Sequence, residues 1–263
     1  RVEDVDLPGP GGSLRLRIYE PRGAPAAGPC VLYIHGGGWV ICSLDTHDGI
    51  CRRLANLSGL RIASLDYRMA PEHPFPAPLD DCLAALSWLR LHGGEVGIDP
   101  GRLGLAGDSA GANLALATCL ALKQRGGAQP ATAALIYGAF SVDLDSPSHR
   151  AFGGGGYVLT TPNMHWVWKQ YVPDPERRSD PLATPLNGDL AGLPPLYVSA
   201  AELDPLRDDS ERMAARLALA GVDFDYRLWR GVTHACFMMS RMLPAADAQL
   251  AEVAGFLRRR LAA

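Results

Sequence analysis

The stretch that most constrains the fold of this chain is residues 103–114, LGLAGDSAGANL, where an apolar run breaks on Gly-x-Ser-x-Gly and continues as an alanine-rich run. This pattern predicts a buried strand, a sharp turn centred on Ser109 and a helix. Gly107 and Gly111 flank the turn, where the absence of a Cβ atom lets two backbone segments approach closely. A serine raised on such a turn is exposed enough to act as a nucleophile. The pentapeptide is short, so its meaning depends on what the rest of the chain supplies.

The composition narrows the class of protein. Of the 263 residues 48% are apolar, which is enough to bury the core of one large α/β domain or two small ones. With 25 basic and 28 acidic residues the net charge is -3, and no long run of one sign occurs, so nucleic acid is not an expected partner. No apolar run reaches the about 18 residues of a membrane span, and no secretory signal opens the printed sequence.

The cysteine pattern favours a cytoplasmic, reduced protein over a secreted protein with disulfides. Four of the six cysteines lie within or beside apolar segments, where a reduced thiol behaves as a small hydrophobic group; they are Cys30, Cys82, Cys119 and Cys236. No CxxC pair and no His/Cys cluster has the spacing of a zinc site, so no metal is expected.

Strand-like and helix-like segments alternate along most of the chain. This alternation predicts an α/β fold with a mostly parallel sheet and helices on both faces. Residues 14–20 alternate apolar and basic side chains, which is typical of a half-exposed edge strand. The other expected strands are residues 30–34, 61–67, 102–106, 133–137, 196–200 and 225–229, and the expected helices are residues 46–57, 79–89, 110–125, 207–220 and 245–261.

Residues 143–193 do not follow the alternation. They contain no convincing buried strand, but four consecutive glycines, a helical stretch at residues 163–171 and several prolines. A long excursion between two core strands is predicted to be a cap, or lid, within a single domain of residues 1–263 rather than a second domain.

A glycine loop follows the expected strand at residues 30–34, and parallel sheets collect their sites at such carboxyl ends of strands. The loop reads His35-Gly-Gly-Gly-Trp39. Backbone N–H groups freed at a strand end can converge on an oxyanion, and glycine lets a carbonyl substrate approach them. An ordinary turn is the alternative, while a phosphate loop is disfavoured because the GxxxxGK[ST] and GxGxxG spacings are absent. Together with Gly-x-Ser-x-Gly downstream, the loop indicates an oxyanion hole.

A general base is expected on a loop after the last strand, and His234 meets this condition. The remaining histidines fit other roles: His92, His149 and His165 are typical of surface loops, while His47 and His73 precede the nucleophile and His73 stands among prolines, where a structural hydrogen bond is favoured.

The acid that orients the base should follow another strand, and Asp204 stands just beyond residues 196–200. Glu202 is the first alternative candidate for this acid. Asp208 and Asp209 would enter the following helix, where a carboxylate serves as a cap or as a partner of the helix dipole. The resulting chain order, Ser109 then Asp204 then His234, is the order of α/β-hydrolases.

Five motifs in this order resemble the hormone-sensitive-lipase-like branch of the α/β-hydrolases over residues 14–260. They are HGGGW at 35–39, DYRMAPEHPFPA at 66–77, GDSAG at 107–111 with Asn113, DPLRD at 204–208 and HACF at 234–237. The resemblance implies the α/β-hydrolase fold and a carboxylesterase for short- or medium-chain acyl esters. It also implies oxyanion donors from the backbone of Gly37, Gly38 and Ala110, and a cap partly formed by residues 143–193. Members of this branch usually carry cap helices before the first strand, whereas here the first expected strand begins by Leu14.

Other residues of these motifs are expected to support the site. Arg68 and Glu72 are predicted to form an ion pair across the proline-stiffened loop, and Asp108 is predicted to be structural. Six aromatic residues are candidates for the wall of an acyl or alcohol pocket, with core or cap packing as the alternative for each: Trp39, Phe140, Tyr157, Trp166, Trp168 and Phe237.

The sequence therefore predicts a serine esterase acting on a small-molecule ester, without a cofactor, in which Ser109 attacks, His234 moves the proton and Asp204 orients His234. Two alternatives stay open: amide or lactone hydrolysis by the same residues, and a non-catalytic ligand-binding member of the fold. A homodimer formed through the last strand or helix is an expectation at the level of the family.

Overall fold

The computed structural model describes residues 1–262, and its centre is an eight-stranded sheet in the order β1-β2-β4-β3-β5-β6-β7-β8. The strands from β3 onward are parallel, whereas β2 pairs antiparallel with both β1 and β4. The strands are β1 (Val2–Gly9), β2 (Gly12–Tyr19), β3 (Gly28–Ile34), β4 (Arg61–Asp66), β5 (Ile98–Asp108), β6 (Ala133–Ile136), β7 (Leu196–Leu203) and β8 (Phe224–Thr233). The predicted α/β fold with a mostly parallel central sheet is confirmed.

The edge of the sheet differs from the prediction. The strand expected at residues 14–20 is present as β2, but it is not an edge strand, because β1 forms a hairpin with it and takes the outer position. Val2 pairs with Tyr19 and Gly9 with Gly12, so the whole length of β1 is used. The prediction of an edge strand at residues 14–20 was therefore wrong, and the first strand begins at Val2.

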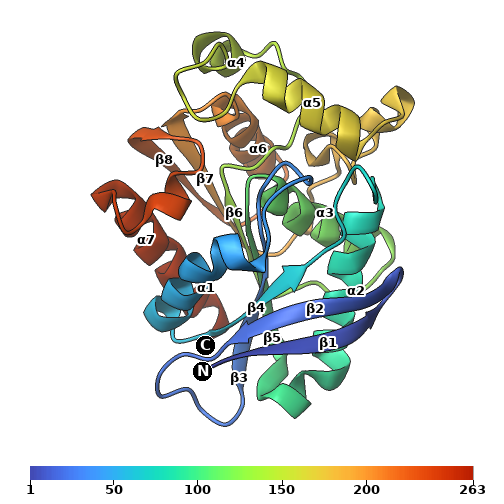
Figure 1. Ribbon diagram of the computed structural model, residues 1–263, viewed down its shortest axis with the longest axis vertical. Coiled ribbons are helices and arrows are strands. Elements are labelled where there is room, and N and C mark those ends of the chain that lie inside the picture. The colour runs from blue at the N-terminus through green and yellow to red at the C-terminus, as the bar shows by residue number, and fades with distance from the viewer. Residues whose placement is uncertain (263) are drawn as a thin grey trace.

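Helices cover both faces of the sheet (Figure 1). Helices α1 and α7 pack in one core with side chains such as Leu54 and Leu257, and helices α2, α3 and α6 pack in the other with Leu86, Leu116 and Met213. The helix bounds are α1 (Leu44–Ser58), α2 (Ala77–His92), α3 (Ala110–Gln124), α6 (Arg207–Leu219) and α7 (Pro244–Leu261). A short 3-10 helix, η1 (Gly93–Val96), follows α2, and another, η4 (Cys236–Met239), follows β8.

Strand β5 explains why the sequence around the Gly-x-Ser-x-Gly turn is so apolar. It lies between β3 and β6, and its side chains enter both cores: Leu105 packs with the α2 and α3 side, and Ala106 with the α1 and α7 side. A strand covered on both faces reads as a continuous apolar run rather than an alternating one.

Residues 143–193, called the cap segment from here on, form short helices above the carboxyl ends of the strands (Figure 1, top). They are α4 (Pro147–Phe152), α5 (Thr161–Tyr171), η2 (Pro175–Ser179) and η3 (Pro185–Asn187), and this described segment contains no strand. Ser146 and Thr160 accept hydrogen bonds at the N-termini of α4 and α5.

Carboxylates at the start of α6 fasten the beginning of the cap segment. Asp209 accepts hydrogen bonds from the amides of Phe140 and Ser141 at 2.8 and 2.9 Å, and Asp208 accepts one from the amide of Ser148 at 2.9 Å. Burial raises the pKa of Asp209 to about 8 despite these two amide donors.

The ion pair predicted between Arg68 and Glu72 was wrong. Arg68 binds Asp81, which is fully buried, with Nη2 and Oδ1 2.7 Å apart, and its amide also donates to that carboxylate at 2.8 Å. Glu72 is exposed. Asp81 lies on the first turns of α2, so Arg68 fastens the proline-rich loop to a helix rather than to itself.

The six cysteines are all unpaired in the described chain. Burial raises the pKa of Cys30 and of Cys119 to about 12, so both thiols are held in the neutral form. No helix among residues 1–262 combines the length and the apolar character needed to cross a membrane.

Candidate active site

The turn at residues 107–111, called the elbow from here on, depends on its two glycines. A Cβ atom on Gly111 would lie 1.9 Å from the carbonyl oxygen of Ile34, and one on Gly107 would lie 2.4 Å from the backbone of Gly111. Between them Ser109 has φ 55° and ψ -118°, a conformation that residues other than glycine rarely adopt. The close packing against β3 therefore holds the serine in a strained position at the end of β5.

Three side chains from three strand ends meet at the elbow. The Nε2 atom of His234 lies 3.0 Å from Oγ of Ser109, and its Nδ1 atom lies 2.7 Å from Oδ2 of Asp204. His234 directly follows β8, and Asp204 directly follows β7. The geometry is that of a nucleophile, a base and an orienting carboxylate within hydrogen-bond reach of one another.

Asp204, rather than its rivals, is the carboxylate that contacts His234. It is fully buried, and its second oxygen accepts from the amide of Leu206 at 2.9 Å, which fixes the carboxylate plane. Glu202 instead accepts from the amide of Gly231 at 2.7 Å. Asp208 and Asp209 hold residues before and within the cap segment, so their contacts are structural, although they are tertiary contacts rather than caps of α6.

The glycine loop at residues 35–39 faces Ser109 with free backbone donors. Gly37 has φ 117° and Gly38 has φ 59°, and a Cβ atom on Gly37 would lie 2.0 Å from the carbonyl oxygen of Ile41. The amides of Gly37, Gly38 and Ala110 have no hydrogen-bond acceptor among residues 1–262. Since Ala110 is the first residue of α3, its amide is one that the helix itself leaves unpaired.

Asp108 makes structural contacts to residues in and beside the glycine loop, as the sequence predicts. Its Oδ1 atom accepts from the hydroxyl of Tyr33 at 2.8 Å and from the amide of Gly36 at 3.0 Å. The ring of His47 lies against the same carboxylate. Asp108 therefore connects the elbow to the glycine loop.

One histidine was placed wrongly by the sequence. His149, expected on a surface loop, is buried in α4, where its Nδ1 atom lies 2.8 Å from Oγ1 of Thr161. It joins α4 to the first turn of α5 inside the cap segment. His92 and His165 are exposed, as expected.

A cavity of about 460 Å³ lies above Ser109, between the elbow, the glycine loop and the cap segment. Its wall is mostly apolar. Besides the elbow and the loop, it is lined by Val40, Ile41, Cys42, His47, Ala139, Val158, Leu159, Asn163, Met164, Trp166, Val167, His234, Ala235 and Met238.

Of the aromatic pocket candidates, only Trp39 and Trp166 line this cavity. Phe140 and Phe237 are fully buried in the two cores, and Tyr157 packs edge-on against Phe152. The four residues outside the cavity wall therefore match the alternative of core or cap packing; the fourth, Trp168, lies 4.6 Å from Trp39 between ring centroids.

The sequence reasoning missed the smaller apolar residues of the wall. Val158, Met164 and Val167 belong to the cap segment, and Met238 belongs to η4. The signal available was their clustering within the helical stretch and after His234, but medium-sized side chains at such places carry no chemical signature.

The arrangement can perform acyl transfer. It offers a serine next to a base, a buried carboxylate that orients the base, and backbone donors at the position where a carbonyl oxygen would gain charge. Among residues 1–262 no group of three His, Cys, Asp or Glu side chains lies close enough together to hold a metal ion.

Comparisons with known proteins find relatives that match nearly the whole chain. Residues 31–238 match a family model described as alpha/beta hydrolase fold. The carboxylic ester hydrolase LipN of Mycobacterium tuberculosis is 36% identical, over 99% of this chain and 70% of its own length. The ethyl acetate hydrolase of Pseudomonas putida is 38% identical, over 95% of this chain and 80% of its own length.

Solved structures are similar over nearly the whole chain. The esterase of Pyrobaculum calidifontis superposes with a TM-score of 0.95 at 40% identity, covering 98% of this chain and 85% of its own. The carboxylesterase EstE1, cloned from a metagenomic library, superposes with a TM-score of 0.96 at 39% identity, covering 99% of this chain and 89% of its own.

Proposed function

The chain belongs to the alpha/beta hydrolase family, in its hormone-sensitive-lipase-like carboxylesterase branch, and on this premise we propose that Ser109, His234 and Asp204 catalyse the hydrolysis of small-molecule carboxylic esters. The single observation that carries the assignment of residues is the continuous contact from Oγ of Ser109 through both ring nitrogens of His234 to Asp204. The chain is an ester hydrolase, as are its relatives.

In the proposed mechanism Ser109 attacks the ester carbonyl while Nε2 of His234 takes its proton. Asp204 holds the ring through Nδ1 and stabilises the imidazolium that forms. The amides of Gly37, Gly38 and Ala110 stabilise the oxyanion. His234 then gives the proton to the leaving alcohol, and the acyl-enzyme is hydrolysed when His234 activates a water molecule in the same way.

The cavity supports a short- to medium-chain acyl ester. Its wall carries apolar side chains on the loop side, at Ile41, and on the cap side, at Val158 and Met164. We assign residues 143–193 as the cap that closes the upper side of the cavity within one domain.

The test of the assignment is Ser109→Ala, measured with p-nitrophenyl esters of graded acyl length. We expect kcat to fall by about 10⁴-fold or more, because the nucleophile is lost while the binding surface stays. The matched control is Ser13→Ala, an exposed serine at the start of β2, which should keep full activity. Undiminished turnover by the Ser109 variant would overturn the assignment.

Two further measurements distinguish the alternative functions. Faster hydrolysis of an anilide than of the matched ester would identify an amidase. If a serine-directed phosphonate does not label Ser109, the chain is a non-catalytic member of the fold.

We propose β8 as the surface through which two copies of the chain associate, with the neighbouring α7 as the alternative. β8 is the last strand of the sheet, and within residues 1–262 its outer edge pairs with no strand. Such an edge offers a row of backbone donors and acceptors to a second copy. Light scattering coupled to size-exclusion chromatography should give the mass of a dimer, and the mass of a monomer at all concentrations would contradict the proposal.

The six unpaired cysteines support a reducing compartment, and we propose the cytoplasm. Thiol quantification on protein isolated from cell fractions should find six reduced cysteines in the cytoplasmic fraction. Recovery of the native protein only from an extracytoplasmic fraction would contradict this.

A further inference from the structure

A second buried pair of a histidine and a carboxylate lies beside the proposed nucleophile. His47 is on the first turn of α1, and its Nε2 atom is 3.3 Å from Oδ1 of Asp108, the residue before Ser109. Both line the cavity, yet neither is more than 3% exposed. The proposed mechanism gives His47 no role, and burying a charged pair is costly enough that its presence requires an explanation.

The hydrogen bonds around the His47 ring define its protonation. The hydroxyl of Thr46 donates its single proton to the carbonyl of Ser43 at 2.8 Å and accepts from the Ser43 amide at 2.9 Å. The oxygen therefore has only a lone pair left for Nδ1 of His47, 2.9 Å away, so Nδ1 has to donate. Nε2 faces a carboxylate, which only accepts. This hydrogen-bond pattern fits an imidazolium, with a proton on each ring nitrogen of His47.

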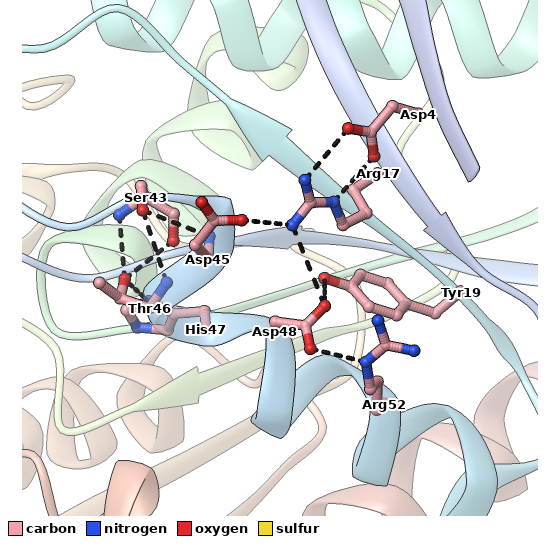
Figure 2. A network of polar contacts seen from close by, with 9 residues as sticks. All are labelled: Asp4, Arg17, Tyr19, Ser43, Asp45, Thr46, His47, Asp48 and Arg52. Carbon is pink, nitrogen blue, oxygen red and sulfur yellow. Dashed lines mark hydrogen bonds and ion pairs between the residues drawn. The ribbon is translucent and has the colours of Figure 1, made fainter. Parts of the chain in front are cut away.

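The first turn of α1 is held so that the ring keeps this position (Figure 2). Ser43 and Thr46 form a capping box at the helix N-terminus. Arg17 on β2 donates to Asp45 on that turn, with Nη1 and Oδ1 2.6 Å apart. Asp45 also offsets the unfavourable interaction between a cation and the N-terminal end of the helix dipole.

Asp108 transmits the position of His47 to the proposed reaction site. It is bonded to Ser109 in the chain, and its Oδ1 atom accepts from the amide of Gly36, next to the proposed donor Gly37. The fit is tight, because a Cβ atom on Gly36 would lie 2.6 Å from Oδ2 of Asp108. A carboxylate this close to the oxyanion hole would oppose negative charge on the substrate oxygen unless a cation neutralised it.

We propose that the imidazolium of His47 is a positioning residue for ester hydrolysis: it neutralises and orients Asp108, so that this carboxylate fixes the glycine loop without opposing the oxyanion. The inference rests on the proposed function, and it gives the buried ion pair a role that fold stability alone would not require.

The ionisation of the groups that face His47 agrees with this role. Burial would lower the pKa of His47, but the charge of Asp108 and its hydrogen bond outweigh burial and raise the pKa above its usual value. Burial would raise the pKa of Asp108, but the charge and hydrogen bond of His47, with the Tyr33 hydroxyl, hold the pKa below its usual value. The His35 ring, 5.4 Å away, has a pKa lowered to about 4, mainly by burial, and stays neutral. Burial raises the pKa of Tyr33 well above its usual value, and Cys42 at the cavity wall also has a raised pKa.

The kinetic test compares His47→Gln, Asp108→Asn and the double variant. His47→Gln leaves the carboxylate without its cation, so we expect kcat to fall about tenfold or more with KM within about threefold of wild type. Asp108→Asn added to His47→Gln removes the uncompensated charge and should recover at least about threefold in kcat. His92→Gln, an exposed histidine far along the chain, is the matched control. A kcat for His47→Gln within twofold of wild type, or a double variant whose losses simply multiply, would overturn the proposal.

The protonation test uses the wild-type protein and so does not depend on a variant that folds. Nitrogen-15 spectra of the histidine rings at pH 7 should show both nitrogens of His47 protonated. The signals of His47 are those missing from the spectrum of His47→Gln. If that variant does not fold, slow exchange of the ring protons with solvent identifies the buried ring. A neutral His47 ring at this pH would overturn the proposal.

The failure of this proposal is distinguishable from the failure of the proposed function. Ser109 in His47→Gln should still be labelled stoichiometrically by a serine-directed phosphonate, because the contacts of His234 and Asp204 are unchanged. If the Ser109→Ala variant is active, the proposed function fails whatever His47 does. If Ser109→Ala is inactive and His47→Gln is fully active, only the role of His47 is lost.

Discussion

The elbow with its glycine loop and the cap segment form opposite walls of the same cavity, but they are held in different ways. The elbow is fixed by backbone packed against backbone: a Cβ atom added to Gly111 would lie only 1.9 Å from the carbonyl oxygen of Ile34. The cap segment is fixed by side chains: Trp39 stacks on Tyr171, with ring centroids 4.3 Å apart, and Asp208 accepts from the amide of Ser148 at 2.9 Å. The wall that holds the proposed nucleophile has no room for a Cβ atom at Gly107 or Gly111, whereas the cap segment depends on side chains that can be exchanged.

The strongest way to break this comparison is Gly111→Ala. The added Cβ atom collides with main-chain atoms that cannot move without shifting β3, so we expect either loss of soluble protein or a fall of about 100-fold or more in kcat/KM. The matched control is Gly154→Ala in the cap segment, where a Cβ atom meets nothing within 4 Å. A soluble Gly111 variant with kcat/KM within threefold of wild type would show that the elbow is not held as described.

The side chain of Asp209, which holds the chain just before the cap segment, should make stability depend on pH. Asp209 has a pKa of about 8 in the folded protein against 3.8 for the ordinary side chain, so between these values the folded state binds a proton that the unfolded state does not. Stability should therefore fall as pH rises through this window, by up to about 1.4 kcal/mol per pH unit. Urea unfolding from pH 5 to pH 8 measures it. Asp209→Asn keeps an oxygen acceptor for the two amides and should flatten the slope, and an unchanged slope would contradict the prediction.

The contact between the glycine loop and the cap segment, at Gly38 and Val167, allows a further test of how the two walls are held. A Cβ atom on Gly38 would lie 2.8 Å from Cγ1 of Val167 on α5, and Gly38 has a positive φ of 59°. We expect Gly38→Ala to lower kcat/KM about tenfold. Adding Val167→Ala removes the collision partner and should recover part of the loss, while Val167→Ala alone should cost less than about threefold. Steady-state kinetics of the three variants decide, and no recovery in the double variant would mean that the cap segment does not press on the loop.

The smallest effect is expected at the rim of the cap segment. Trp166 lines the cavity but is 53% exposed, so Trp166→Ala removes apolar contact area without disturbing the core. We expect kcat/KM to fall about two- to fivefold for an octanoyl ester and less for an acetyl ester. A panel of acyl lengths measures this, with exposed Leu91→Ala on α2 as control. Equal losses for all acyl lengths would place Trp166 outside the acyl path.

The same difference between the two walls explains what could be predicted from sequence. The elbow, the glycine loop, Asp204 and His234 follow from local patterns, because a glycine pair or a strand end has the same meaning wherever the chain goes. The cap segment could be recognised only as an interruption, because its packing depends on side chains from distant elements.

The errors have physical reasons. Arg68 was paired with Glu72 by nearness in the chain, but α2 brings Asp81 closer and buries it. Large aromatic residues were considered for the pocket, yet Phe140 and Phe237 are fully buried, one in each of the two cores. A large aromatic side chain gains stability from such burial wherever the core can hold it. Strand β1 could not be recognised from the sequence because Pro8 and Gly9 end it and the acidic residues Glu3, Asp4 and Asp6 interrupt its apolar residues.

The elbow's contact with the end of β3 also has a consequence for how the protein is made. Ile34 and Gly111 are distant in the chain, and Ser109 receives its base from 125 residues further on. Such long-range contacts close late, since loop-closure entropy has to be overcome first. During synthesis from the N-terminus, a chain that has reached α3 holds the serine but lacks β7, β8 and the histidine that follows them. If Ser109 and His234 act as proposed, the nascent polypeptide therefore cannot hydrolyse esters before β8 and His234 have been translated.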